Sequence, residues 1–202
     1  MATVTPIRLG ILGSTKGTDL EAIVSAIDAG VLEATVEIVI SNKSQAYILE
    51  RARRHGIATQ FIGAKNKTRE AFDREVTAVL ENRRVELILL VGFMRILSPA
   101  FCERWQNRIL NVHPSLLPAF AGGMNLDVHQ AVLDAGVRET GCTIHFVTPE
   151  VDAGPIVIQK RCSIEPGETA ESLKAKVQAL EGEAFIQAIQ QYQNHQLDHL
   201  FR

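Results

Sequence analysis

The sequence predicts an α/β fold: a single domain with a doubly wound, mostly parallel sheet of the Rossmann type. Apolar strand-like runs alternate with amphipathic helical patterns through the first two-thirds of the chain, which is typical of βαβ units. The run 85–91 is almost wholly apolar, as expected for a strand that is buried on both faces of a parallel sheet. The length of 202 residues suits one domain and is short for two, so we expect one domain over 1–202.

The first half of the chain is expected to alternate strictly between strands and helices. Strands are predicted at 7–13, 36–41, 58–62 and 85–91, and helices at 19–29, 46–55 and 68–82. Thr18 and Glu21 have the Thr-x-x-Glu spacing of a capping box, which would start the first helix. Gly56 is expected to end the second helix.

The second half is expected to finish the sheet with two strands and a long helix. A helix should begin at Ser98-Pro99, with serine as the cap and proline in the first turn. A short strand should end at His113, and a helix should cover 126–135. Strands at 142–148 and 155–164 are joined by a short loop, which favours an antiparallel pair. The region 169–195 is expected to be helical, and its tail from 187 either packs on the domain or frays.

The composition excludes several classes of protein. A net charge of -2 and a pI near 6.3 give no reason to expect a nucleic acid or an anionic membrane as a partner. The three cysteines are far apart and form no CxxC pair, so reduced thiols are expected rather than a disulfide framework or a zinc site. The N-terminus lacks a signal-peptide pattern, and the apolar run 87–94 is too short to span a bilayer. We therefore expect a cytoplasmic protein with small-molecule partners, and a homodimer is compatible with the sequence.

Asn111 and His113 are the most informative pair of side chains. They are two residues apart on a predicted strand, so they point to the same side of it. Pro114 ends the strand, and in an open α/β sheet the carboxyl ends of the strands face the ligand crevice. A hydrogen-bond donor beside a titratable imidazole suits a reaction that develops an oxyanion and moves a proton. The alternative is an ordinary, partly buried histidine.

The loop 13–19 joins the first strand to the first helix. It offers free backbone N–H groups, two threonines and Lys16, and this makes it a plausible phosphate cradle. Its spacing fits neither a Walker A loop nor a GxGxxG fingerprint. Asp19 counts against an anion at this place unless Lys16 offsets its charge, and a plain strand-to-helix turn is the alternative.

Two further segments are candidates for a site. His145 lies on a β-branched strand and is either a core histidine or a residue that positions Asp152. Asp152 precedes Gly154-Pro155 in a tight loop, where it either caps its own backbone or reaches His113 and favours the charged imidazole. The apolar segment 92–97 follows a buried strand and either lines a pocket for a flat ring or packs under the next helix.

Three motifs at these separations together resemble the folate-dependent formyltransferases. They are Asn-Val-His-Pro-Ser-Leu-Leu-Pro at 111–118, Gly-Phe-Met-Arg-Ile-Leu at 92–97, and His-Phe-Val-Thr-x-x-x-Asp-x-Gly-Pro at 145–155. The resemblance runs in order from the first strand to about Phe185. It implies transfer of a formyl group from 10-formyltetrahydrofolate to the amine of glycinamide ribonucleotide, a step of purine biosynthesis, by direct attack through a tetrahedral intermediate and without a metal.

The resemblance also assigns residues to roles. It implies a catalytic trio of Asn111, His113 and Asp152, and we add His145 as a residue that positions Asp152. It implies an acceptor site of Gly17, Thr18, Asp19 and Glu181, to which the loop chemistry adds Lys16. It implies a folate pocket of Arg69, Phe93, Met94, Arg95, Ile96, Leu97, Val147, Glu150 and Val151.

Two segments depart from the family pattern. The phosphate loop usually ends in Ser-Asn, whereas Thr18-Asp19 stands here with Lys16 nearby. The loop after Pro118 usually reads Pro-Gly-x-His, but here 121–126 reads Ala-Gly-Gly-Met-Asn-Leu. Both would adjoin the acceptor. The alternatives are therefore a formyltransferase acting on another amine, such as an amino sugar nucleotide, a 10-formyltetrahydrofolate hydrolase, or, in a different class, a non-catalytic folate- or nucleotide-binding protein. The hydrolase family carries an extra N-terminal domain, for which the first strand near Ile7 leaves no room.

Overall fold

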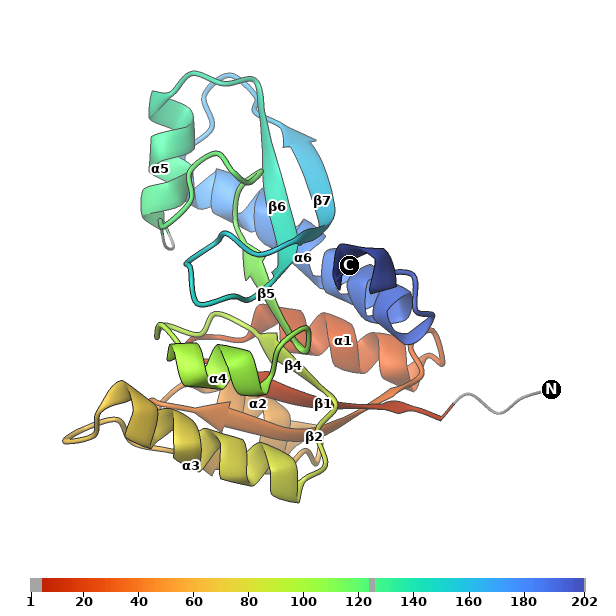
Figure 1. The fold of residues 1–202 in the computed structure, drawn as a ribbon. Helices are drawn as coiled ribbons and strands as arrows, with labels where there is room; N and C mark the ends of the chain where they lie inside the picture. The colour runs from red at the N-terminus through yellow and green to blue at the C-terminus, as the bar shows by residue number, and fades with distance from the viewer. Residues whose placement is uncertain (1–4, 124–125, 202) are drawn as a thin grey trace. The chain divides into compact units, whose positions relative to one another are not determined.

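The computed structural model describes residues 5–123 and 126–201 (Figure 1). It is an α/β fold with a seven-stranded sheet, and the chain divides into two compact units, Met1–Leu110 and Asn111–Arg202. Strand β5 (Ile109–His113) begins in the first unit and ends in the second. The residues that were predicted to carry catalysis, from Asn111 to Asp152, all belong to the second unit.

The first unit confirms the predicted alternation of parallel strands and helices. Its strands are β1 (Ile7–Leu12), β2 (Ala34–Ser41), β3 (Thr59–Phe61) and β4 (Leu87–Leu90), in the order β3-β2-β1-β4. The pairs β1–β2, β1–β4 and β2–β3 are parallel. Its helices are α1 (Thr18–Asp28), α2 (Tyr47–Arg54), α3 (Arg69–Asn82) and α4 (Pro99–Arg104). All four residues of β4 are buried, which is what its apolar sequence predicted.

The predicted capping box at α1 is wrong. Thr18 is the first residue of the helix rather than its cap, and Gly17 takes the cap position with φ 66° and no side-chain hydrogen bond. Glu21 instead accepts a hydrogen bond from Arg51 Nη1 at 2.7 Å and lies 2.8 Å from His55 Nε2. The left-handed backbone at glycine therefore starts this helix, and the acidic residue binds to α2.

The second unit contains the antiparallel pair that the sequence indicated. Strand β6 (Glu139–Phe146) pairs antiparallel with β7 (Ile156–Ser163), in the order β5-β6-β7. The helices are α5 (Leu126–Asp134) and α6 (Ala170–Gln193), and a capping box at Thr169 and Ser172 starts the long one. Val128 and Val132 of α5 pack with Leu173 of α6 in a buried cluster.

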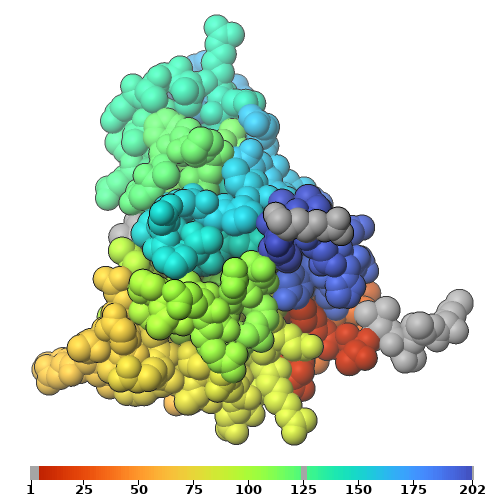
Figure 2. Space-filling view, viewed as in Figure 1, coloured from red at the N-terminus to blue at the C-terminus, as the bar shows by residue number. Residues whose placement is uncertain are grey.

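The C-terminal tail packs on the second unit. A short 3-10 helix, η1 (Asp198–Phe201), follows α6, and the ring of Phe201 meets that of Phe146 edge-on at 4.9 Å between centroids. Leu197 is buried, so the tail is not frayed there. Figure 2 shows this segment (dark blue) at the surface of the face in view. No helix of the described residues is long and apolar enough to cross a membrane.

Candidate active site

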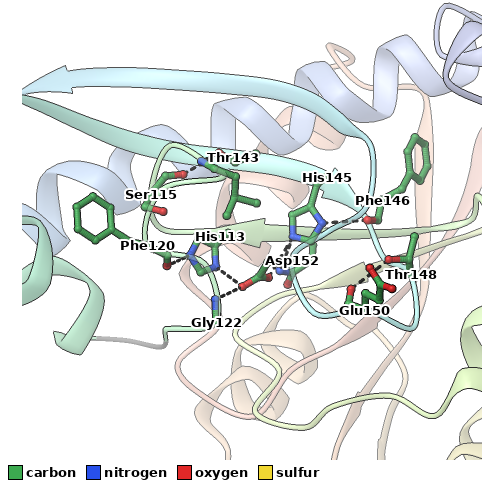
Figure 3. Close-up of polar contacts among 12 residues, drawn as sticks. His113, Ser115, Phe120, Gly122, Thr143, His145, Phe146, Thr148, Glu150 and Asp152 are labelled. Atoms are coloured by element: carbon green, nitrogen blue, oxygen red, sulfur yellow. Dashed lines mark hydrogen bonds and ion pairs between the residues drawn. The ribbon is translucent and has the colours of Figure 1, made fainter.

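A buried histidine–aspartate pair forms the centre of the candidate site (Figure 3). Nδ1 of His113 lies 3.2 Å from Oδ2 of Asp152, and the two side chains are only 4% and 9% exposed. The other ring nitrogen, Nε2, lies 2.9 Å from the backbone carbonyl of Phe120. Both nitrogens therefore face hydrogen-bond acceptors, and this geometry accommodates an imidazolium with both of its protons satisfied.

The loop between β6 and β7 brings Asp152 to His113. Asp152 has φ 54°, a left-handed conformation that aspartate and asparagine tolerate better than most residues. Two residues later the loop passes so close to β6 that a Cβ atom at Gly154 would lie 1.8 Å from the Phe146 carbonyl oxygen. Oδ2 of Asp152 also accepts a hydrogen bond from the Gly122 amide at 2.8 Å. The carboxylate is thus held by His113 and by the backbone of the loop that follows β5.

His145 joins Asn111 to the pair. Nδ1–H of His145 donates to the Phe146 carbonyl at 2.9 Å, so Nε2 can accept from the Asn111 amide at 3.1 Å. The same Nε2 lies 3.6 Å from Oδ1 of Asp152. The structure therefore brings Asn111, His113, His145 and Asp152 together in one unit. The predicted roles of these residues stay predictions.

The surroundings shift the pKa values of both members of the pair. Burial lowers the pKa of His113, while the Asp152 carboxylate and the Phe120 carbonyl act in the opposite direction. Asp152 thus raises the pKa of His113, as expected, but the effect of burial is larger and the net shift is downward. Burial alone would raise the pKa of Asp152, yet the close contact with His145, the hydrogen bond from the Gly122 amide and the neighbouring His113 hold it below its usual value. Asp152 is therefore ionised at neutral pH, ready to stabilise a proton on His113.

In the first unit, loops that follow three different strands meet. Ser14, which follows β1, is buried, and its hydroxyl donates to Oδ1 of Asn42, which follows β2. The same hydroxyl accepts a hydrogen bond from the backbone N–H of Met94, which follows β4, at 2.8 Å. The predicted phosphate loop is thus bound to the predicted folate loop through one serine side chain.

Helix α2 fixes the carbonyl groups of the loop 13–19. The Thr15 carbonyl accepts from the Ile48 amide at 3.1 Å, and the Lys16 carbonyl accepts from Arg51 Nε at 2.8 Å. The Lys16 side chain is exposed, as is Thr18, whereas Gly17 and Asp19 are buried. Burial raises the pKa of Asp19 to about 7, which reduces the charge that an anion at this loop would meet.

The predicted binding residues outside the loop 13–19 differ in how far they are buried. Glu181 is buried on α6 of the second unit, with 7% of its surface exposed. Phe93 and Leu97 are buried, whereas Ile96 is 56% exposed. The Arg95 guanidinium lies over the Phe72 ring at 4.4 Å, and its Nε is buried without a hydrogen-bond partner. The remaining members, Arg69, Val147, Glu150 and Val151, are exposed or half-buried. Met124 and Asn125 of the divergent loop lie outside the described residues.

Sequence reasoning missed the groups that support the site. Phe120 and Gly122 contribute through their backbones, for which side-chain identity gives no signal. Arg51 lies on a helix far along the chain from the loop it holds. The three cysteines are free, as expected. No cluster of three or more metal-ligating side chains occurs among residues 5–123 and 126–201.

Comparison with known proteins identifies the family. The sequence profile described as formyl transferase matches residues 7–189. The chain belongs to the formyl transferase family. Within this family, the phosphoribosylglycinamide formyltransferase of Escherichia coli (strain K12) is 41% identical over 172 residues, which are 85% of this chain and 80% of that protein.

Two further relatives extend the comparison. The trifunctional purine biosynthetic protein adenosine-3 of Gallus gallus is 45% identical over 185 residues, 91% of this chain. The chain spans only 18% of the length of that larger protein. A crystal structure of glycinamide ribonucleotide transformylase 1 from Symbiobacterium toebii aligns with a TM-score of 0.90 at 39% identity, over 96% of this chain and 90% of that one. The predicted fold class and family are thus confirmed.

Proposed function

We propose that this formyl transferase moves the formyl group of 10-formyltetrahydrofolate to the amine of glycinamide ribonucleotide, in purine biosynthesis. The buried His113–Asp152 pair carries the proposal, because an ionised carboxylate 3.2 Å from an imidazole prepares the imidazole to hold a proton beside a developing negative charge. The names of the relatives in E. coli and S. toebii support the acceptor. We further propose that 1–202 forms one formyltransferase domain, since the family profile spans both compact units.

The reaction proceeds by direct attack. The acceptor amine adds to the formyl carbon, the carbonyl becomes an oxyanion, and the bond from that carbon to the folate nitrogen then breaks. The proton that leaves the amine ends on the folate nitrogen. Holding the two reactants in a near-attack geometry supplies on the order of 7–11 kcal/mol of the barrier.

Asn111 and protonated His113 stabilise the oxyanion. The negative charge that develops on the formyl oxygen raises the pKa of His113 and so offsets the burial that lowers it in the free site. In the free site Nε2 of His113 is bonded to the Phe120 carbonyl, so that hydrogen bond must be exchanged for one to the formyl oxygen. Asp152 holds the imidazole through Nδ1 and helps to relay the proton, and His145 fixes Asn111.

The first unit supplies binding groups for both substrates in this proposal. The N–H groups at the start of α1, with Lys16 and Thr18, bind the phosphate of the ribonucleotide. The loop of residues 93–97, with Arg69, receives the folate. Glu181, on α6 of the second unit, also binds the acceptor. No metal takes part. A homodimer stays a prediction that sedimentation equilibrium tests.

The Asp152→Asn variant tests the assignment. Asparagine tolerates the left-handed backbone at this position, so the variant should fold and bind folate as the parent does. It removes the negative charge beside His113, and kcat should fall by roughly 10²–10⁴-fold. Circular dichroism and a folate titration check folding and binding, and steady-state kinetics give kcat.

An exposed aspartate provides the matched control. Asp134→Asn makes the same chemical change at the exposed last residue of α5 and should leave kcat unchanged. A folded Asp152→Asn variant with near-parental turnover would reject the catalytic role of the pair and, with it, the proposed mechanism.

A further inference from the structure

We propose that Gln159 is a positioning residue for formyl transfer, which acts by fixing the loop that holds His113. The inference rests on the proposed function. Gln159 lies on β7 directly opposite Thr143 of β6. Its Nε2 donates one hydrogen bond to the Leu117 carbonyl at 2.8 Å and another to the Thr143 hydroxyl at 3.1 Å. One proton of the amide therefore binds the loop 114–120 to the sheet, and the other binds the Thr143 hydroxyl of β6, which holds the same loop.

The Thr143 hydroxyl is the junction of this support. It is fully buried, donates to the Ser115 carbonyl at 2.7 Å, and accepts from the Leu117 amide at 3.0 Å and from Gln159. One donor and two acceptor positions are all that a hydroxyl offers, so its capacity is exhausted. Without Gln159, the hydroxyl and the Leu117 carbonyl would each lose a partner.

The supported loop leads directly to His113. Ser115 donates to the Ala119 carbonyl at 2.7 Å, which closes the loop on itself. The next residue, Phe120, presents its carbonyl to Nε2 of His113 at 2.9 Å. His113 and Phe120 lie at the two ends of one loop. Among the described residues, the middle of this loop is hydrogen-bonded to the sheet through Ser115 and Leu117, which bind Thr143 and Gln159. A looser middle would allow the ends, and therefore the imidazole, to shift.

A small displacement of the imidazole would affect the chemical step more than binding. Misplacement of a catalytic group by about 1 Å can cost on the order of 10²-fold in rate. Gln159 supplies part of the support, so the Gln159→Met variant, of similar length without the donors, should lose about tenfold in kcat. The KM values for both substrates should stay unchanged, because Gln159 lies behind the loop rather than in either proposed binding site.

The control variant lies on the same strand. Lys160→Met removes a side-chain hydrogen bond, that of Nζ to Glu183 at 2.8 Å, on the opposite face of β7. It should keep parental kcat. The ¹⁵N resonances of the His113 ring provide a second readout, and they should shift in Gln159→Met and not in Lys160→Met. If Gln159→Met does not fold, Gln159→Glu repeats both measurements with the same side-chain length and without the amide donors.

A double-variant cycle separates positioning from general stability. If Gln159 acts through His113, then Gln159→Met should cause no further loss of kcat in a His113→Ala background. An equal loss in both backgrounds, or parental kcat and ring resonances in the single variant, would overturn the inference. The failure of the proposed function looks different, since the parent protein itself would then show no turnover that depends on glycinamide ribonucleotide.

Discussion

Asp152 combines a strained backbone with a buried charge at one residue. Its φ of 54° is costly for a residue other than glycine, and strain of this kind costs on the order of 1–3 kcal/mol. The hydrogen bond from the Gly122 amide and the contacts with both histidines offset this cost. The left-handed backbone of Asp152 directs its carboxylate at His113. The strained conformation therefore serves the proposed chemistry.

Asp19 predicts a pH dependence of stability. Its carboxyl is 5% exposed, and burial raises its pKa from 3.8 to about 7. The folded state therefore holds the proton more tightly than the unfolded state. The resulting stabilisation is complete below about pH 4 and is lost as the pH rises through about 7. Asp19→Asn is neutral throughout. Its free energy of unfolding, relative to the parent, should therefore rise between about pH 4 and pH 8 by an amount on the order of 4 kcal/mol.

Urea unfolding at several pH values measures this difference. A difference between Asp19→Asn and the parent that does not change with pH would show that the Asp19 carboxyl titrates normally. Asp28→Asn, on the same helix and exposed at its last turn, is the matched control and should show no such trend.

The position of Lys16 predicts that its loss affects the KM for the ribonucleotide more than kcat. Its side chain is exposed, and its backbone carbonyl, rather than its ammonium group, is bound by Arg51. Lys16→Ala should therefore leave the loop in place and remove only a cation near the proposed phosphate. The KM for the ribonucleotide should rise several-fold, with a smaller change in kcat. Initial-rate kinetics decide the point: an unchanged KM contradicts a phosphate-binding role, and Arg83→Ala controls for the loss of an exposed cation.

At the residue scale, the sequence indicated the side chains of the site but not the groups that hold them. Asn111 and His113 could be paired because a strand places residues i and i+2 on one side. Asp152 could be proposed because its motif precedes Gly154-Pro155. The contact of His113 with the Phe120 carbonyl could not be predicted, because a backbone carbonyl is the same at every residue. The hydrogen bond from Gln159 to Leu117 joins residues 42 positions apart, so it depends on the tertiary fold.

At the scale of elements, the start of α1 depends on the absence of a side chain. A Cβ atom at Gly17 would lie 2.3 Å from Cγ1 of Ile48, and φ there is 66°. Gly30 has a similar φ of 69°, but a Cβ atom there would meet nothing within 4 Å. The two glycines thus separate backbone strain from steric overlap.

Gly17→Ala should destabilise the protein more than Gly30→Ala. Both variants carry the cost of a left-handed alanine, and only the first forces Ile48 to move, which adds roughly 1–3 kcal/mol. Thermal or chemical unfolding of the two variants measures the difference. Equal destabilisation would mean that Ile48 gives way without cost, and the loop 13–19 would then be less firmly held than the contacts indicate.

The element boundaries show what local sequence can and cannot predict. Ser98-Pro99 starts α4 as its cap chemistry indicated, and α6 begins close to the expected position, behind a capping box at Thr169 that was not predicted. Thr18 and Glu21 matched a capping pattern equally well, but Ile48 and Arg51 of α2 determine that turn instead. Strand β6 begins at Glu139, three residues earlier than expected, because it pairs with β7 from its first residue. Where local sequence signals were ambiguous, contacts with other elements therefore determined the residue at which a helix or strand begins.

At the scale of the whole molecule, the order of strands and helices was predictable, because hydrophobic periodicity reports it directly. The parallel pairs of the first unit and the antiparallel pair β6–β7 follow from the lengths of the connections. The acceptor was not predictable from periodicity or fold, because function depends on particular sites. It rests on the motifs around Asn111, His113 and Asp152 and on the relatives that share the family.

The most direct test of the account is the rate of formyl transfer from 10-formyltetrahydrofolate by the purified protein, followed by the change in folate absorbance. The assay compares glycinamide ribonucleotide, an amino sugar nucleotide and no acceptor. The account predicts turnover that depends on glycinamide ribonucleotide and is negligible without an acceptor. Loss of the formyl group at the same rate without any acceptor would indicate a hydrolase, and turnover only with the amino sugar nucleotide would show that the proposed acceptor is wrong.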